Sequence, residues 1–478
     1  MNLPFKLVVL WTDVVLWVML VGLLAYVRVV RRDETLQATW RRVFVVPAAM
    51  AAAAVLTTML VITLFDSIHF RRALPDVRGG VQAYDTRTDS LLDVALAKLV
   101  ASREDSYSRP WATHGFSKQT VPPSPGAVPE LDEHGVPKLP PRAYPRLKHG
   151  GAGLADPSQD WSTDIACRVG VGALAALLGA LLLRRILPRE RTGGPAWHAA
   201  WVACVVMMTM LSVAIALSWG QGYHVLGTDR TGNDVLYMTI KSIRTAFVIG
   251  SLATVATLPL ALAFGIAAGY FKGWVDDVIQ YIYTVLSSVP NILLIAACVL
   301  MVQVFMDQHM DLFETGLERA DLKIFLLCVI LGVTGWAGLC RLLRAETLKL
   351  RELEYVQAAT AFGASHWRIM RWHILPNVMH LVLITTVLEF SGLILYEAVL
   401  SYVGVGVDPS MNSFGGMINQ ARVEMSREPI VWWSFAAAFV FMVSIVLSAN
   451  IFADAVRDAF DPRARVARPV RVKRPTAA

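Results

Sequence analysis

Long apolar runs separated by short polar stretches are the main pattern of this chain. Nine runs have the length of about 20 residues that a helix needs to cross a bilayer. We predict a membrane-spanning helix for each: 7–28, 43–65, 163–183, 197–219, 244–270, 278–305, 323–343, 378–402 and 431–453. The pattern therefore predicts an all-α, polytopic membrane helix bundle. The composition agrees, because 55% of the 478 residues are hydrophobic and only 17% are charged.

Basic residues next to the predicted spans indicate the orientation of the chain. The first connection carries Arg28, Arg31, Arg32, Arg41 and Arg42, and a later one carries Arg184, Arg185, Arg189 and Arg191. The C-terminal tail is also basic. The positive-inside rule places such segments in the cytosol, which predicts an external N-terminus and a cytosolic C-terminus. The net charge of +7 then has a membrane origin and does not indicate nucleic-acid binding.

Several kinds of chemistry have no motif in this sequence. The five cysteines are Cys167, Cys204, Cys298, Cys328 and Cys340; all lie in or at the ends of apolar runs, and none forms a CxxC pair. We therefore expect neither a disulfide framework nor a metal site. No GxxxxGK[ST] loop is present, so we expect the chain not to bind ATP itself. No catalytic Ser-His or HExxH arrangement suggests an enzyme.

Residues 66–160 form one long segment that we expect on the external side. Ser90 to Arg103 has leucines on one side, which predicts a short amphipathic helix on the membrane surface. From Pro110 onward the segment is rich in proline, which disfavours helices and strand ladders. Two interpretations stay open: a surface for an external partner, or an insertion without an essential role.

The segment from Leu353 to Asn377 combines apolar, basic and helix-ending residues between two spans. Gly363 can adopt a positive φ and end a first short helix that begins near Leu353. Ser365 can cap a second helix that runs to Ile374, and Pro376 suits the first turn of the following span. The sequence thus predicts a helix–glycine–helix elbow on the cytosolic side.

Two features of the elbow indicate contact with another protein. Trp367, Met370 and Ile374 form one apolar stripe, while other apolar residues lie on other sides. The small pair Ala358 and Ala359 allows close approach to the first helix. A hairpin that packs only on its own bundle is the alternative. We expect Gln357, Ala358, Ala359, Gly363 and Pro376 to transmit motion, with Trp367, Met370 and Leu375 contributing to packing.

Polar residues inside the predicted spans are candidates for a translocation path. Glu389 lies near the middle of the eighth span and Glu397 near its outer end, and each is either a path residue or a structural hydrogen-bond partner. Ser288 and Pro290 lie in the sixth span, which we expect to kink or loosen there. Asp13 is close to the outer end of the first span, where it can reach water.

The sequence Gly227-Thr228-Asp229, followed by Gly232 and Asp234, predicts an external turn. The side chain of Thr228 or Asp229 can cap the helix that follows. We interpret this element as a turn that positions the fifth span rather than as a substrate site.

Five motifs resemble those of the dipeptide/oligopeptide branch of ABC importer permeases, the inner-membrane components of binding-protein-dependent transport systems. Residues 355–376 resemble the EAA loop, which ends in glycine, a spacer and Leu-Pro. The other four resemble GTDxxGRDVL at 226–236, GYxGGWVD at 269–276, EAALSFLGLG at 397–406 and LRDALDPR at 456–463. They follow the family order over about half of the chain. Gln357 stands where the EAA triplet has Glu, and Asn233 stands where the turn motif has Arg.

The resemblance implies a permease subunit of a bacterial inner-membrane importer, for di- or oligopeptides. A second homologous permease subunit would complete a heterodimer, two cytosolic ABC ATPases would hold ATP and Mg, and an external binding protein would deliver substrate. We divide the chain into an N-terminal extension (1–65), an external segment (66–160), an extra span with its cytosolic loop (161–195), a permease core (196–463) with the coupling loop (344–377), and a basic tail (464–478).

An ion-gradient-driven secondary transporter is the main alternative. It would use Glu389 and Glu397 and would need no ATPase, but it leaves the cytosolic elbow without a role.

Overall fold

The computed structural model describes residues 5–74, 84–120, 142–186, 194–220, 222–313 and 315–460. Within these residues, eight helices are long and apolar enough to cross a membrane, and nine spans result if α11 and α12, bent by 42° at their junction, count as one. The predicted all-α helix bundle is therefore confirmed. Arg189, Arg191 and the predicted basic tail from residue 464 onward lie outside the described residues.

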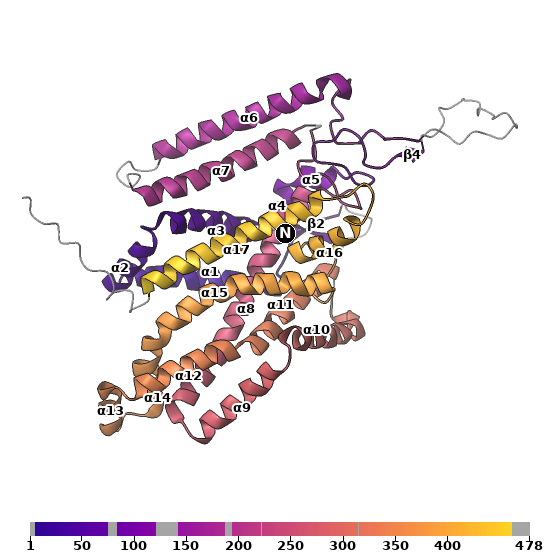
Figure 1. Ribbon diagram of the computed structural model, residues 1–478. Helices are drawn as coiled ribbons and strands as arrows, with labels where there is room; N and C mark the ends of the chain where they lie inside the picture. Colours follow the sequence, from indigo (N-terminus) through magenta and orange to yellow (C-terminus); the bar gives the residue numbers. More distant parts are fainter. Residues whose placement is uncertain are drawn as a thin grey trace, which may run out of the picture.

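Figure 1 shows the spans, most of which run roughly in one direction, while the longest helix among them crosses the others at a steep angle. They are α1 (Trp11–Val30), α3 (Pro47–Asp66), α6 (Pro157–Ile186), α7 (Pro195–Ser218), α8 (Val235–Phe271), α10 (Asn291–Gln308), α11 (Gly316–Gly335), α12 (Ala337–Arg351), α15 (Leu375–Val403) and α17 (Trp433–Phe460). Shorter helices connect them: α2 (Glu34–Val43), α4 (Leu91–Ala95), α5 (Ala97–Ala101), α9 (Trp274–Ser288), η1 (Met310–Leu312), α13 (Glu354–Ala361), α14 (His366–Ile369), η2 (Met370–Ile374) and α16 (Phe414–Glu424).

Two predicted spans are discontinuous or displaced. The run 278–305 is not one helix, because α9 ends at Ser288 and α10 begins at Asn291. Pro290 explains the break, since proline has no N–H for the helical ladder and its ring restricts the preceding residue. Helix α8 begins earlier than predicted, at Val235, where the carboxylate of Asp234 accepts hydrogen bonds from the N–H groups of Leu236 and Tyr237.

The external segment takes part in both sheets found among the described residues. β1 (Phe5–Val8), β2 (His69–Ala73) and β3 (Tyr84–Ser90) form an antiparallel sheet, and β4 (Gln119–Thr120) pairs with β5 (Arg142–Ala143). The expectation that no strand ladder forms beyond Pro110 was wrong, because β4 and β5 use short proline-free stretches. The predicted surface helix at 90–103 is instead two short helices, and Leu92 is buried.

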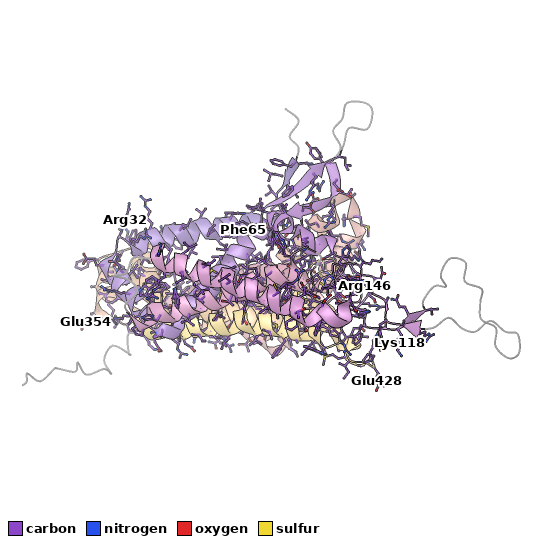
Figure 2. All side chains as sticks on the ribbon, turned by 90° about the horizontal axis from the view of Figure 1, so that it is seen from above. Arg32, Phe65, Lys118, Arg146, Glu354 and Glu428 are labelled. Atoms are coloured by element: carbon purple, nitrogen blue, oxygen red, sulfur yellow. The ribbon has the colours of Figure 1, made fainter. Side chains whose placement is uncertain are left out.

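The N-terminal extension is part of the same bundle. Helix α3 packs against α7, α8 and α17, and α1 packs against α8 and α11. The Arg32 and Glu354 side chains lie at one end of the bundle, and Lys118, Arg146 and Glu428 lie at the opposite end (Figure 2). The basic connection after α1 and the elbow therefore share one end, as the predicted topology requires.

Candidate coupling site and external turn

A glycine ends the first helix of the elbow. Gly363 has φ +77°, a conformation that costs other residues steric strain. Its N–H donates to the carbonyl of Thr360 (3.0 Å), and the N–H of Ala364 donates to the carbonyl of Ala359 (3.1 Å). This pair of bonds is a Schellman motif. A side chain at position 363 would meet no atom within 4 Å, so the glycine is required by backbone geometry and not by crowding.

The second helix of the elbow continues into the membrane through one π-helical turn. Ser365 caps its first turn, as predicted. The segment Met370–Ile374 then has i→i+5 hydrogen bonds, and the N–H of Leu375 donates to the carbonyl of Met370. Pro376 lies in the first turn of α15. Because a proline ring clashes with the carbonyl four residues earlier, the wider π turn just before it allows the helix to continue.

The π turn divides the apolar residues of this helix between two faces. Ile369 and Ile374, five residues apart, are fully buried, and Met370 and Leu375 pack against the same core. Trp367 and Trp372, also five residues apart, are 69% and 68% exposed. The prediction of a single stripe formed by Trp367, Met370 and Ile374 was wrong, because it assumed a regular helical period through the turn.

The elbow therefore has a free apolar face. Phe362 is 91% exposed, and together with Trp367 and Trp372 it forms what we call the outer aromatic face. The small side chains of the first helix are also accessible, since Ala358 is exposed and Ala359 is partly exposed. Gln357 is exposed, and its amide donates to the carbonyl of Glu352 (3.1 Å). Exposed apolar patches are typical of protein or membrane contact sites.

The other side of the elbow is fastened to the core. The hydroxyl of Tyr270 at the end of α8 contacts Nδ1 of His366 (2.9 Å), and Arg351 donates to the carbonyl of Tyr270 (2.5 Å). Deeper in the bundle, Gly265 and Gly269 of α8 leave no room for a Cβ against α12. Such small residues let two helices approach closely. The elbow is therefore attached to α8 and α12 together.

The candidate path residues have different surroundings. Glu397 is 1% exposed and accepts a hydrogen bond from Ser401 (2.7 Å). This is the arrangement of a structural hydrogen bond. Glu389, near the middle of α15, is partly exposed. Ser288 and Pro290 are exposed at the break between α9 and α10. The four residues stay predictions for a translocation path.

The turn before α8 has an internal hydrogen-bond network. Gly227 and Gly232 have φ +74° and +78°. The carboxylate of Asp229 accepts from the N–H groups of Thr231 and Asn233. Neither Thr228 nor Asp229 caps the helix, which corrects the predicted cap: Asp234 does so, because it directly precedes the first helical residue. The hydroxyl of the fully buried Thr228 instead donates a hydrogen bond to the carbonyl of Ser106 and accepts one from the N–H of Ser108, both in the external segment.

A buried charged cluster joins this turn to the external segment. His224 contacts Asp234 (2.7 Å) and Glu104 (3.3 Å). Burial favours the neutral imidazole, but the two carboxylates outweigh it and raise the pKa of His224 to about 9. Burial likewise opposes ionisation of Glu104, yet His224 and the N–H groups of Lys148, His149 and Gly150 lower its pKa to about 2. Both groups are therefore charged at neutral pH.

A second buried network holds the extension on the core. Arg244 of α8 contacts Asp13 of α1 (2.7 Å) and Asp321 of α11 (3.6 Å). His69 of β2 contacts the same Asp13 carboxylate (2.8 Å). Asp13 is only 3% exposed, so the expectation that it reaches water was wrong. Asp13 and Arg244 lie within predicted apolar runs and Asp321 lies just before one, but nothing in the sequence indicated that these charged residues meet.

No group of three or more His, Cys, Asp or Glu side chains with metal-binding geometry occurs in the described parts of the chain. The five cysteines are all free.

Comparison with known proteins identifies the core. Residues 261–466 match the family described as the binding-protein-dependent transport system inner membrane component. The oligopeptide transport system permease protein OppC of Haemophilus influenzae is 31% identical over 245 residues, which cover 51% of this chain and 72% of OppC. OppC of Mycobacterium tuberculosis is 31% identical over 242 residues, covering 51% of this chain and 77% of that protein.

Two further matches involve other systems. The peptidoglycan transport system permease protein YejE of Agrobacterium fabrum is 36% identical over 241 residues, 50% of this chain and 57% of YejE. Among solved structures, a chain of the inward-facing MetNI methionine ABC transporter aligns with 47% of this chain and 94% of its own, with 19% identity and a TM-score of 0.34. On the sequence matches, the chain belongs to the inner-membrane permease subunits of binding-protein-dependent ABC importers.

Proposed function

We propose that this chain is one half of the translocation pathway of an ATP-driven importer for di- or oligopeptides. A second, homologous permease subunit forms the other half. Two cytosolic ABC ATPases bind ATP and Mg and dock on the elbows, and an external binding protein delivers the peptide. The N-terminus is external and the C-terminus is cytosolic. The peptide cargo is supported by relatives that are named as oligopeptide permeases.

The observation that carries this proposal is the two-sided elbow. Its inner side, with Ile369 and Ile374, is buried in the core, while none of the residues that the structure describes covers the outer aromatic face. A cytosolic ATPase pair that changes conformation between nucleotide states would bind this face with a different free energy in each state. A ligand or partner shifts a conformational equilibrium only through such a difference. The link from His366 to Tyr270 and on to α12 then carries the displacement into the pathway.

A substitution at Gly363, where the chain turns between the two helices of the elbow, tests the coupling of the elbow to transport. In Gly363→Val, a β-branched residue must adopt φ +77°, which costs roughly 1–3 kcal/mol and displaces the outer aromatic face. Gly220 is a matched control, because it also has a positive φ (+64°), would also place a Cβ with no atom within 4 Å, and lies after α7 at the opposite end. We expect Gly363→Val to reduce uptake of labelled peptides about tenfold or more and Gly220→Val to leave it near normal.

The same assay contains the outcomes that count against the proposal. Normal peptide uptake by Gly363→Val would reject coupling through the elbow. Uptake that persists after ATP depletion, with the ion gradient intact, would reject an ATP-driven importer. Normal ATP-dependent transport of another solute without peptide uptake would reject only the cargo.

A further inference from the structure

The external segment covers the turn that precedes α8. A Cβ at Gly232 would lie 1.7 Å from the carbonyl oxygen of Glu104, and one at Gly227 would lie 2.5 Å from that of Ser108. Arg103 also donates to the carbonyl of Thr231 (2.8 Å). A soluble protein that approaches this end of the bundle at this point would therefore meet the covering segment before the turn itself.

The covering segment is held together, and held on the core, by several contacts. It consists of residues 103–120, the first strip, and 142–155, the second strip. The N–H of Gly115 donates to the carbonyl of Pro145 (2.8 Å), and the N–H of Leu147 donates to the carbonyl of Thr113 (3.0 Å), which joins the two strips. The ring of Phe116 packs edge-on against Trp433 of α17 (5.0 Å). The Glu104 carboxylate accepts three N–H groups from the second strip. The segment is thus attached to α17 and to the turn before α8.

The strands β4 and β5 project from this base beyond the ends of α6 and α7 (Figure 1), and Lys118 and Arg146 lie at the same end of the molecule (Figure 2). Residues 106–120 and 142–155 contain no Asp or Glu, and their Lys and Arg residues are Arg109, Lys118, Arg142, Arg146 and Lys148. Lys148 is paired with Asp105. Three carboxylates, Glu130, Asp132 and Glu133, belong to 121–141, outside the described residues.

We propose that the basic hairpin surface is a docking site for the substrate-binding protein, which would meet it with an acidic surface. The surface comprises Arg109, Trp111, Lys118, Arg142, Tyr144 and Arg146, all of which are exposed. This inference rests on the proposed import function. Arginine and aromatic residues are enriched at the energetic centres of interfaces. Anionic lipid headgroups are disfavoured as the partner, because the hairpin points away from the helix ends along the bundle axis.

The test uses the complete transporter in proteoliposomes and the purified, peptide-loaded binding protein encoded with it. The variant Lys118→Glu/Arg142→Glu reverses two charges that make no salt bridge in the described structure. The control Arg87→Glu reverses an exposed charge on β3, in the other sheet. We expect the double variant to raise the half-maximal binding-protein concentration for ATPase stimulation roughly three- to tenfold at low salt, with a weaker salt dependence, because interface charges mainly set association rates.

Each outcome either supports the docking site, overturns it, or rejects the proposed function. A rise in the double variant but not in Arg87→Glu, with the ATPases still copurifying, supports the docking site. Equal half-maximal concentrations in the double variant and the unmodified transporter overturn it. A change that follows the phosphatidylglycerol content of the vesicles rather than the binding-protein concentration assigns the surface to headgroups and also overturns it. If the unmodified transporter hydrolyses ATP without responding to any peptide-loaded binding protein, the proposed function fails instead.

Discussion

The two ends of the bundle are built on opposite principles. At the end that holds the turn before α8, which we propose to be external and call the external end, charged side chains are buried and paired across the extension, the turn and the core: Arg244 is 3% exposed, Glu104 is 4% exposed and His224 is 3% exposed. At the elbow end, large apolar side chains are exposed, and Phe362 reaches 91%. The external end pairs its buried charged groups with partners in the same chain. The other end leaves large apolar groups that none of the described residues covers.

This difference separates stability from coupling. Buried ion pairs are expensive to break, because the remaining partner is left charged without compensation. Exposed aromatic residues contribute little to the stability of the isolated chain but much to an interface. Substitutions of the buried charged groups at the external end should therefore affect folding first, and substitutions of the exposed aromatic residues at the elbow should affect partner binding first. The three predictions that follow test this contrast, in order of their expected effect on stability.

The largest loss of stability is expected for Arg244→Ala. The substitution leaves the carboxylates of Asp13 and Asp321 buried without their shared cation, at a cost of about 3–5 kcal/mol. Thermal unfolding of the protein in detergent measures the effect, and Arg41→Ala, which removes an exposed arginine at the other end, is the control.

A compensated variant makes this test sharper. Replacing Arg244 together with both of its carboxylate partners, as Arg244→Met with Asp13→Asn and Asp321→Asn, should recover most of the stability, because replacing a buried ion pair or triad by uncharged residues is often nearly neutral. If Arg244→Ala unfolds at the same temperature as Arg41→Ala, the network does not hold the extension on the core.

A smaller, pH-dependent effect is expected at the covering segment. The pKa of His224 is raised from 6.5 to about 9, so its stabilisation is complete below pH 6.5 and is lost as the pH rises through about 9. The pKa of Glu104 is lowered from 4.5 to about 2, so its stabilisation is complete above pH 4.5 and is lost as the pH falls through about 2. The cluster is therefore most stabilising between pH 4.5 and 6.5, and His224 determines its loss on the alkaline side.

Hydrogen exchange of residues 102–116 at pH 6.5 and pH 9 measures this loss. His224→Gln is compared at each pH, so that the intrinsic pH dependence of exchange cancels. The difference in protection between the unmodified protein and His224→Gln should shrink at pH 9. Lys98, Lys148 and His149 line the cavity of about 160 Å³ beside the cluster. A difference that is equal at both pH values would show that the stabilisation by His224 does not change between them.

The sequence predicted the elbow because its determinants are local. Gly363 needs only its own φ, and Ser365 needs only the N–H three residues later, so both could be predicted from neighbouring residues. The π turn was missed, although Pro376 was the signal: a proline that continues a helix requires an adjustment in the preceding turn. Because of that adjustment, Trp367 does not share a stripe with Met370 and Ile374 and lies on the exposed side.

The external end could not be predicted in the same way. Arg244 lies 231 residues from Asp13, and Glu104 lies 120 residues from His224. Contacts at such separations depend on how the spans pack, which the period of apolar residues does not specify. The same reason explains the helix cap before α8. Thr228 was a plausible cap by its type, but the external segment engages its hydroxyl, and Asp234 takes that role.

The smallest change in stability, and the clearest change in partner binding, is expected for Trp367→Ala. Trp367 is 69% exposed, and the control Trp219→Ala removes a tryptophan that is 71% exposed at the opposite end. Both variants should unfold within about 0.5 kcal/mol of the unmodified protein, as surface substitutions usually do. Copurification of the ATPases should fall only for Trp367→Ala, on the order of tenfold or more if the residue carries the roughly 2 kcal/mol typical of an interface anchor. Equal recovery of the ATPases with both variants would leave the outer aromatic face without a partner, and the contrast between the two ends would then be one of stability alone.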